Sequence, residues 1–353
     1  GELASGLTYD FSATAGSSRI GFFASNVPNP SMGSLSPTVF PRVGDQIMAE
    51  KFVNADFAYP VAIQGFESPL NVAFGLAWQD EDFEILAGEQ ASFQAGVLAN
   101  QGFLIGEEAI PGFSPLISGE FGRHNVAAYV DLEADITRAL TLGAAVRTED
   151  FSDDTGSETT YKVSGMFRFT DDLAFRATYS TGFHAPTIGQ TRFSTTTTEF
   201  DDNGNLLESG QIPPTSPTAL AVGAMPLRPE TSDSITAGIV FETDKLALTL
   251  DTYYIEVDDR VTLSASQSLT DQQRQELIDQ GFQAAAGIGS FRFFTNDFAT
   301  ETKGVDLIAT MPLDLFSGGD TELALAFNYT KTEVTSFDPN DPNELLDAVR
   351  IAQ

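Results

Sequence analysis

The chain has 353 residues, of which 42% are hydrophobic and 19% are charged, a composition that excludes a disordered protein and fits about two globular domains or one large barrel. A net charge of -32, from 50 acidic and 18 basic residues, excludes nucleic acid as a partner, because phosphate binding needs clustered Lys and Arg. Cysteine is absent and His124 and His184 are the only histidines, so we expect no disulfide framework, no metal site and no cofactor.

The sequence contains no run of eighteen apolar residues, which excludes a membrane-spanning helix but leaves a membrane-spanning barrel open. Gly1 falls at the edge of a strand pattern with no signal peptide before it, and the last residues, ELLDAVRIAQ, have the pattern of a loop interior. We therefore expect a fragment that is cut at both ends.

Apolar and polar residues alternate with period two along most of the chain. The segment TYKVSGMFRF presents Lys162, Ser164, Met166 and Arg168 on one face, and on the other Tyr161, Val163, Gly165, Phe167 and Phe169. The following segment, DLAFRATYS, has Leu173, Phe175, Ala177 and Tyr179 on its apolar face, and DSITAGIVF, KGVDLIATM and ELALAFNYT repeat the pattern. We count about twelve such segments of about ten residues, the length that a membrane barrel strand requires.

The connections between these segments are predicted to alternate strictly between short and long. Short links occur at ITR from Ile136, TDD from Thr170 and TDK from Thr243, and long polar segments cover 24–49, 81–123, 185–231 and 258–299. Short turns at one end and long loops at the other are typical of an outer-membrane barrel, whereas a soluble sandwich mixes its loop lengths.

Aromatic residues are predicted to form two girdles on the apolar faces. Phe169, Phe175 and Phe241 lie near the short turns, and the long-loop end has Tyr161, Tyr179, Tyr254 and Tyr329. A general preference of aromatic residues for strands is the alternative explanation.

One long loop contains a predicted helix. In LTDQQRQELIDQGF, Thr270 is the expected N-cap, Gln273 follows three residues later, Leu277 and Ile278 share a face, and Gly281 ends the helix. We expect this helix to pack on a barrel rim. The stretches STTTTEF and QIPPTSP are predicted to be mobile loop.

No motif predicts an enzyme, because the sequence has no GxSxG and neither histidine lies in a catalytic pattern. Acidic clusters surround Asp153 and Asp338, but neither has the spacing of a calcium loop, and we interpret both as solvated loop tips. Cations that bridge such loops to anionic lipid headgroups are the alternative.

Four cations lie on the polar faces of three consecutive predicted strands: Arg147, Lys162, Arg168 and Arg176. Because an arginine on the lipid face costs about 2–4 kcal/mol at mid-membrane, we place these side chains in the lumen. There they could contact a plug or an anionic solute. The commoner arrangement pairs them with carboxylates such as Asp251 or Asp306.

The stretch LAFRATYSTGFHAPT resembles TonB-dependent outer-membrane receptors, in which an Arg-containing strand runs into a Gly-Phe-Arg-Ala-Pro-Ser motif. Gly182, Phe183, Ala185 and Pro186 match that motif, while His184 and Thr187 depart from it. Other segments follow the family's order between Asn71 and Thr330, among them VRTEDFSDDTGSETTYKVSGMFRFTDDL, LRPETSDSITAGIVFE and TNDFATETKGVDLIAT.

The resemblance implies an all-β, transmembrane, antiparallel up-and-down barrel of about twenty-two strands, closed by an N-terminal plug, in a Gram-negative outer membrane. Residues 1–353 would then supply about twelve of those strands. The plug with its TonB-contacting segment and the C-terminal strands would be absent. By itself, the chain is expected to form an open, curved sheet.

The implied function is TonB-dependent import of a bulky, scarce nutrient such as an iron chelate (a siderophore complex), cobalamin or an oligosaccharide. The expected partners are the TonB complex, outer-membrane lipid and the small-molecule nutrient. A passive porin-like or adhesive barrel and a secreted all-β binding module are the alternatives.

The glycine-proline stretch is predicted to be a loop exit and not an active site. It consists of Gly182, Phe183, His184, Ala185 and Pro186. Gly182 would let the chain leave the wall, and Pro186 would stop further pairing because it has no amide proton.

Overall fold

Eleven antiparallel strands form one large sheet in the computed structural model, which describes residues 1–107, 112–115, 117–200, 206–282, 285, 287–313 and 321–336. The order in the sheet is β1-β2-β3-β4-β5-β6-β7-β10-β11-β14-β15, so every strand lies beside its neighbour in the chain apart from inserted loop elements. The strands are β1 Thr8–Ser25, β2 Val39–Val61, β3 Leu70–Ala87, β4 Gly119–Asp135, β5 Leu140–Phe151, β6 Ser157–Arg168, β7 Leu173–His184, β10 Glu230–Thr243, β11 Leu246–Leu263, β14 Phe294–Leu313 and β15 Thr321–Val334.

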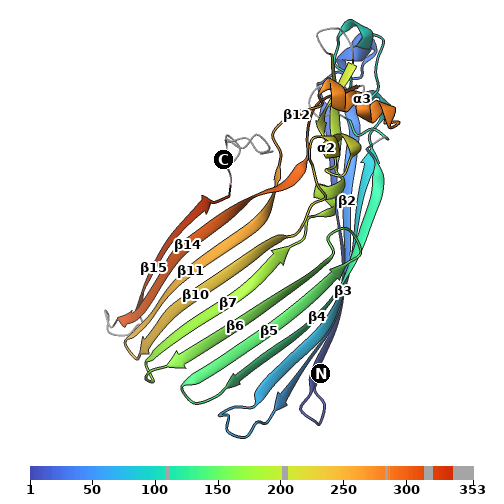
Figure 1. Cartoon of the computed structure of the whole chain (residues 1–353). Helices are drawn as coiled ribbons and strands as arrows, with labels where there is room; N and C mark the ends of the chain where they lie inside the picture. The colour runs from blue at the N-terminus through green and yellow to red at the C-terminus, as the bar shows by residue number, and fades with distance from the viewer. Residues whose placement is uncertain are drawn as a thin grey trace.

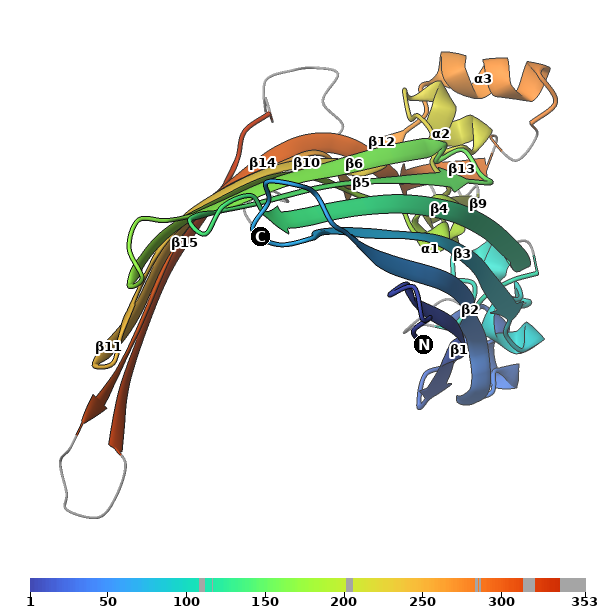
Figure 2. The same ribbon diagram turned by 90° about the horizontal axis from the view of Figure 1, so that it is seen from below.

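The sheet is curved into an open arch, with β1 at one end and β15 at the other (Figures 1 and 2). Within the described residues, each of these two strands pairs along one side only. This confirms the predicted up-and-down barrel wall and its open, curved form.

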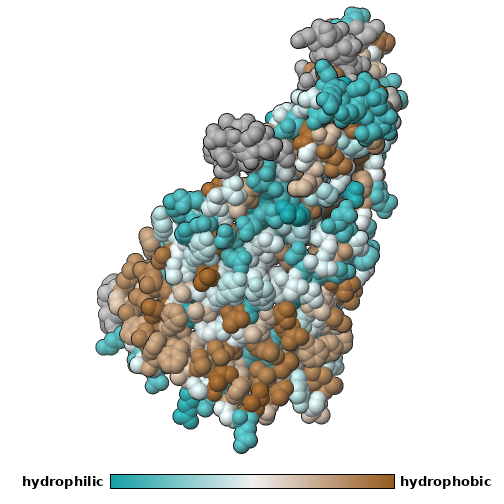
Figure 3. Space-filling model, in the orientation of Figure 1, coloured by the Kyte–Doolittle hydropathy of each residue, from teal (hydrophilic) through white to brown (hydrophobic). Residues whose placement is uncertain are grey.

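The predicted apolar registers lie together on the convex face of the arch. Phe175 is directly opposite Ile239 on β10 and Phe167 on β6, so the apolar rows of neighbouring strands align. Large apolar side chains stay exposed there, for example Val163 at 56% and Leu325 at 61%. Figure 3 shows this apolar band over the lower part of the strands, below a polar band. An apolar band of this kind is typical of a wall that faces lipid.

Most strands are longer than the predicted ten residues, and the sheet has eleven strands, not twelve. The strand β2 has 23 residues and includes part of the segment 24–49 that was predicted to be loop. Likewise, β3, β4, β11 and β14 continue into the predicted loops. These extensions contain apolar side chains that are buried near the loops, for example Phe40, Val43, Phe83 and Ile85. Their pattern does not continue the exposed alternation of the band, although the backbone ladder continues.

The predicted strict alternation of connection lengths is wrong at one place. The strands β5 and β6 are joined at the long-loop end by only five residues, 152–156. Gly156 has a φ of 77°, and the Thr155 amide donates to the Asp153 carboxylate at 3.1 Å. Local turn chemistry therefore explains this acidic tip.

The long loops contain a second, four-stranded sheet with the order β12-β13-β9-β8. Its strands are β8 Thr195–Phe200, β9 Leu206–Gln211, β12 Gln267–Ser268 and β13 Ile288–Arg292. The stretch STTTTEF, predicted to be mobile loop, is therefore a strand. Its β-branched threonines suit a strand, and pairing with β9 supplies the backbone partners that local sequence could not reveal.

The helices of the described residues are short and lie in the loops. They are α1 Ile188–Arg192, α2 Pro217–Ala221, α3 Asp271–Asp279, and the 3-10 turns η1 Pro30–Leu35, η2 Gln90–Ser92 and η3 Ala99–Gln101. None of them has the length and apolarity to cross a membrane. The predicted helix is α3, with the Thr270–Gln273 capping box formed and Gly281 at a φ of 97° just after it.

Candidate functional site

The concave face of the wall holds all four predicted cations. Arg147 on β5 lies opposite Thr160, and Lys162 on β6 lies opposite Ser180, which is two residues from Thr178 on the same face of β7. Arg176 and Arg168 share this register. The strands therefore bring the four side chains to the surface that would line a barrel lumen.

Arg176 forms the best-defined ion pair of this face. Its guanidinium donates to both carboxylate oxygens of Asp251, at 3.0 and 2.6 Å, and so bridges β7 to β11 across the intervening strand β10. The bridge passes over Gly238, where a Cβ atom would lie 1.9 Å from Asp251 Oδ1 and 3.2 Å from Arg176 Nε. A side chain at position 238 would therefore displace the pair. The predicted pairing with Asp251 is confirmed.

A hollow of about 780 Å³ lies beside this pair on the inner wall. Hydroxyl and carboxylate groups line much of it, including Thr178, Thr236, Thr302 and Asp306. These groups can donate and accept hydrogen bonds, and Tyr253 and Ile255 add apolar surface beside them. The hollow is therefore suited to a ligand, or a segment of another protein, that has both polar and apolar groups.

The other three cations are held less tightly. Arg147 donates to Glu149 at 2.6 Å on its own strand, and Arg168 donates to the Thr141 hydroxyl at 3.3 Å. Lys162 forms no ion pair with any described residue. The four cations are thus spread along the wall and do not converge on one point.

The rings of two tyrosines lie over glycines of neighbouring strands on the concave face. The Tyr129 hydroxyl donates to Asp56 at 2.7 Å, and its ring passes over Gly75, where a Cβ atom would lie 2.6 Å from the ring. Tyr253 similarly covers Gly304 and reaches Thr330 at 2.6 Å. Each ring thus covers strand backbone that would otherwise face the lumen.

The exit motif begins later than predicted. Gly182 is still paired with Ser232, β7 continues to His184, and the chain leaves the wall at Ala185. The glycine has an ordinary backbone conformation, and a Cβ atom there would lie 2.8 Å from the Ser232 hydroxyl. Gly182 therefore gives room to a neighbouring strand. Pro186 is fully buried just after the strand ends.

Arg123 anchors this exit, and sequence patterns gave no indication of it. Its buried guanidinium donates to the Pro186 carbonyl at 2.7 Å and to Glu81 at 2.5 Å. Its charge also lies 5.3 Å from the centre of the Phe151 ring, and Phe151 packs edge-to-face on Phe183. The residues lie far apart in the chain, so only the fold brings them together. They fix the start of the longest loop on the rim.

A second charged cluster stabilises the other side of the rim. Arg19 and Arg42 both contact Asp45, at 2.9 and 2.8 Å. The hydrogen bond from Arg19 is the main cause that holds the pKa of Asp45 below its ordinary value of 3.8, and burial opposes it. The carboxylate stays ionised and ties β1 to the start of β2.

The described parts of 188–229 and 264–293 form one unit, which we call the loop layer. The parallel pairing of β13 with β9 joins these two loops. Its apolar core consists of Ile212, Ala219, Ala224, Leu269, Leu277, Ala285, Phe291 and Phe293. The side chain of Asn296 ties its base, because it accepts from the Arg228 amide at 2.9 Å and donates to the Asp259 carbonyl at 2.6 Å. The layer is a packed platform above the wall.

Of the two acidic clusters, the structure describes the one around Asp153. Within the described part of the chain, no group of three or more histidine, aspartate or glutamate residues is arranged to hold a metal ion. Asp153 contacts Arg123 at 3.7 Å, and the cluster around Asp338 lies outside the described residues.

The comparisons with known proteins agree with this geometry. Residues 2–350 match the family model described as TonB dependent receptor-like, beta-barrel. No curated protein matches the chain. Among solved structures, the outer membrane transporter YddB from Escherichia coli superposes with a TM-score of 0.61 at 12% identity, covering 94% of this chain and 41% of that one.

The siderophore receptor PirA from Acinetobacter baumannii gives a TM-score of 0.55 at 16% identity, covering 94% of this chain and 43% of that one. The copper transporter OprC gives 0.52 at 13% identity, with 92% and 43% covered. The chain thus spans less than half the length of these structures, and identities this low show the fold alone. Because the family model spans nearly all of the sequence, the chain belongs to the TonB-dependent receptor β-barrel family, a family of outer-membrane receptors and transporters of Gram-negative bacteria.

Proposed function

We propose that this chain forms part of the barrel of an outer-membrane receptor that imports a bulky, scarce nutrient by TonB-dependent active transport. The observation that carries the proposal is a wall with an exposed apolar band on its convex face, cations on its concave face and a packed loop layer at one end of its strands, in a chain of this family. A solute captured by such loops has a polar wall to pass along. The proposed activity is transport without enzymatic chemistry.

We further propose that the described sheet is the middle of a larger barrel. The open edges at β1 and β15 and the coverage of 41–43% of the matched structures support this. In this proposal a plug domain, which contacts TonB, and further C-terminal strands complete the receptor. Backbone groups at an open strand edge would otherwise be unpaired in lipid.

The solute is an iron chelate, cobalamin or an oligosaccharide in our proposal. The fold does not choose among solutes, because matched structures include a siderophore receptor, a copper transporter and a peptide importer. The four inward cations would contact the plug or an anionic solute. Arg176 and Arg147 already have carboxylate partners, so Lys162 and Arg168 are the better candidates for such contacts.

Uptake in a Gram-negative host with and without TonB tests this function. The full-length protein would be expressed in both strains, and cells would be offered a labelled ferric siderophore, cobalamin or an oligosaccharide. We expect one of these solutes to accumulate only when both the protein and TonB are present. Equal accumulation in the two strains would instead establish a passive barrel.

A further inference from the structure

We propose that the hollow on the concave face is a subsite for an uncharged oligosaccharide, with the ring of Tyr253 as the surface on which a sugar unit stacks. This inference rests on the proposed function and narrows its solute to one chemical class. The hollow has a volume of about 780 Å³. Sites for small molecules commonly have volumes of about 300–1,000 Å³, so the hollow is large enough to hold part of such a solute.

The hollow offers no free cation to an anionic solute. Arg176 is the one cation among its described lining residues, and its guanidinium donates to both carboxylate oxygens of Asp251. Asp306 lies directly opposite Asp251, accepts a hydrogen bond from the Asn328 amide and forms no ion pair with any described residue. An anionic iron chelate would therefore meet an occupied guanidinium and a carboxylate of its own sign, which disfavours that class here.

Uncharged hydroxyl groups form a row across the hollow. Thr236 on β10 lies directly opposite Thr178 on β7 and, on its other side, opposite Tyr253 on β11. Thr302 on β14 adds a further hydroxyl to the lining. A hydroxyl both donates and accepts hydrogen bonds, and a carboxylate such as Asp306 accepts them. These groups can therefore bind the hydroxyls of a sugar without any net charge on the ligand.

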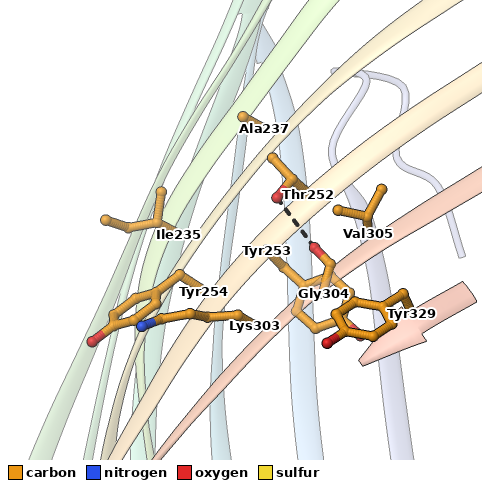
Figure 4. A pocket seen from close by; sticks show the side chains of 9 residues that line it. All are labelled: Ile235, Ala237, Thr252, Tyr253, Tyr254, Lys303, Gly304, Val305 and Tyr329. Carbon is orange, nitrogen blue, oxygen red and sulfur yellow. Dashed lines mark hydrogen bonds between the residues drawn. The ribbon is translucent and has the colours of Figure 1, made fainter. Parts of the chain in front are cut away.

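The ring of Tyr253 supplies apolar surface in the same row. Figure 4 shows Tyr253 beside Gly304, its direct partner on β14. The ring passes over this glycine, and its hydroxyl meets Thr330 on the next strand at 2.6 Å, so the side chain extends along the wall. The ring is half-buried and lines the hollow. A sugar unit has an apolar C–H face and a rim of hydroxyls, which matches an aromatic ring set among threonines.

The height of Tyr253 on the wall suits a solute that arrives from the long loops. Tyr254, its neighbour in the chain, belongs to the aromatic girdle predicted at the long-loop end of the apolar band, the level of a membrane interface. From there the hollow continues to Arg176 and Asp251, which lie further from the loops. A solute released by the loops would thus meet the tyrosine first.

Calorimetric binding of oligosaccharides to the full-length protein in detergent tests the subsite, with maltoheptaose, xylohexaose and cellohexaose as probes. We expect one of them to bind with an affinity that does not depend on salt concentration, because the ligand carries no charge. Tyr253→Ala should weaken this binding about ten-fold through the loss of stacking. Tyr253→Phe, which keeps the ring, should restore most of the affinity.

Tyr129→Ala is the matched control, because Tyr129 also covers a strand glycine, Gly75, but does not line the hollow. It should bind within about two-fold of the parent. Failure of all three probes to bind, an equal loss in this control, or full affinity in Tyr253→Ala would overturn the proposal. Full affinity together with easier proteolysis of the plug in Tyr253→Ala would show that a plug segment fills the hollow instead.

Two further arms separate other classes of ligand from the proposed one. Asp306→Asn keeps an acceptor oxygen, so oligosaccharide binding should fall by less than about ten-fold. Salt-dependent binding that Asp306→Asn abolishes would identify a cationic ligand and overturn the proposal. TonB-dependent uptake of a ferric siderophore or cobalamin that Tyr253→Ala leaves unchanged would overturn the subsite and keep the proposed function. Oligosaccharide binding that requires Tyr253, with uptake independent of TonB, would support the subsite and overturn that function.

Discussion

In the lower half of the wall the large apolar side chains point away from the protein, whereas in the loop layer they point into a core. Val163 and Leu325 are more than half exposed, while Phe291 and Phe293 are almost completely buried. The wall depends on its backbone ladder and on lipid, and the loop layer depends on ordinary apolar burial. Apolar residues of the same type can therefore lie on an exposed outer face in one region of the chain and in a buried core in another.

The largest expected effect is a loss of stability that is confined to the loop layer. Phe293→Ala should destabilise the loop layer by about 3–5 kcal/mol, because it leaves a cavity around a fully buried ring. The wall should be unaffected. Limited proteolysis should show cleavage within 188–229 and 264–293, while heat-dependent gel migration stays that of the parent. If the variant lost both the protease resistance of the loop layer and the heat-dependent gel migration of the wall, the two regions would fold as one unit.

The next largest effect is expected from a charge introduced on the convex face of the wall. Phe175→Arg should make the free energy of folding into the membrane less favourable by about 2–4 kcal/mol, because the side chain at position 175 lies on the convex face. Thr178→Arg, which points into the inner hollow, should have a much smaller effect. Folding yields into lipid vesicles compare the two variants. Equal yields would contradict the assigned faces.

A smaller effect is expected where the inner wall needs a glycine. Gly238→Ala places a Cβ atom 1.9 Å from Asp251 Oδ1, so the Arg176–Asp251 bridge should break at a cost of about 1–3 kcal/mol. Gly16→Ala is the matched control, because a Cβ atom there meets nothing within 4 Å. Urea titration in lipid measures both. A neutral Gly238→Ala would show that the wall does not depend on this bridge.

The smallest effect is a local dependence on pH at the rim. The pKa of Asp45 is lowered from 3.8, mainly by Arg19, so its contribution to stability is present at neutral pH and is lost as pH falls through the lowered value. Hydrogen exchange of β1 and β2 should rise in that acidic range. Asp45→Asn should exchange faster than the parent at neutral pH and show no such rise, and an identical pH response in both would remove Asp45 as the cause.

The wall was largely predictable, and the loops were not. Alternation located the lipid-facing registers of β6, β7 and β10, and the Thr270–Gln273 pattern located α3, since each signal is local in sequence. The extension of β2 was missed because its apolar residues, such as Phe40 and Val43, are buried and do not continue the exposed alternation of the wall. The strands β8 and β9 were missed because they are short and have no alternating pattern. Of the candidate site, the face of the four cations could be predicted, but Arg123 could not.

The sequence by itself determined the family and which side chains of β6, β7 and β10 share the apolar face, because period-two alternation follows directly from strand geometry. Only the tertiary structure decided what those side chains contact. Arg123 meets Pro186, Arg176 crosses β10 to Asp251, and two separate loops share one core. These contacts join residues distant in the chain, and their geometry depends on strand register and curvature, which no local pattern encodes.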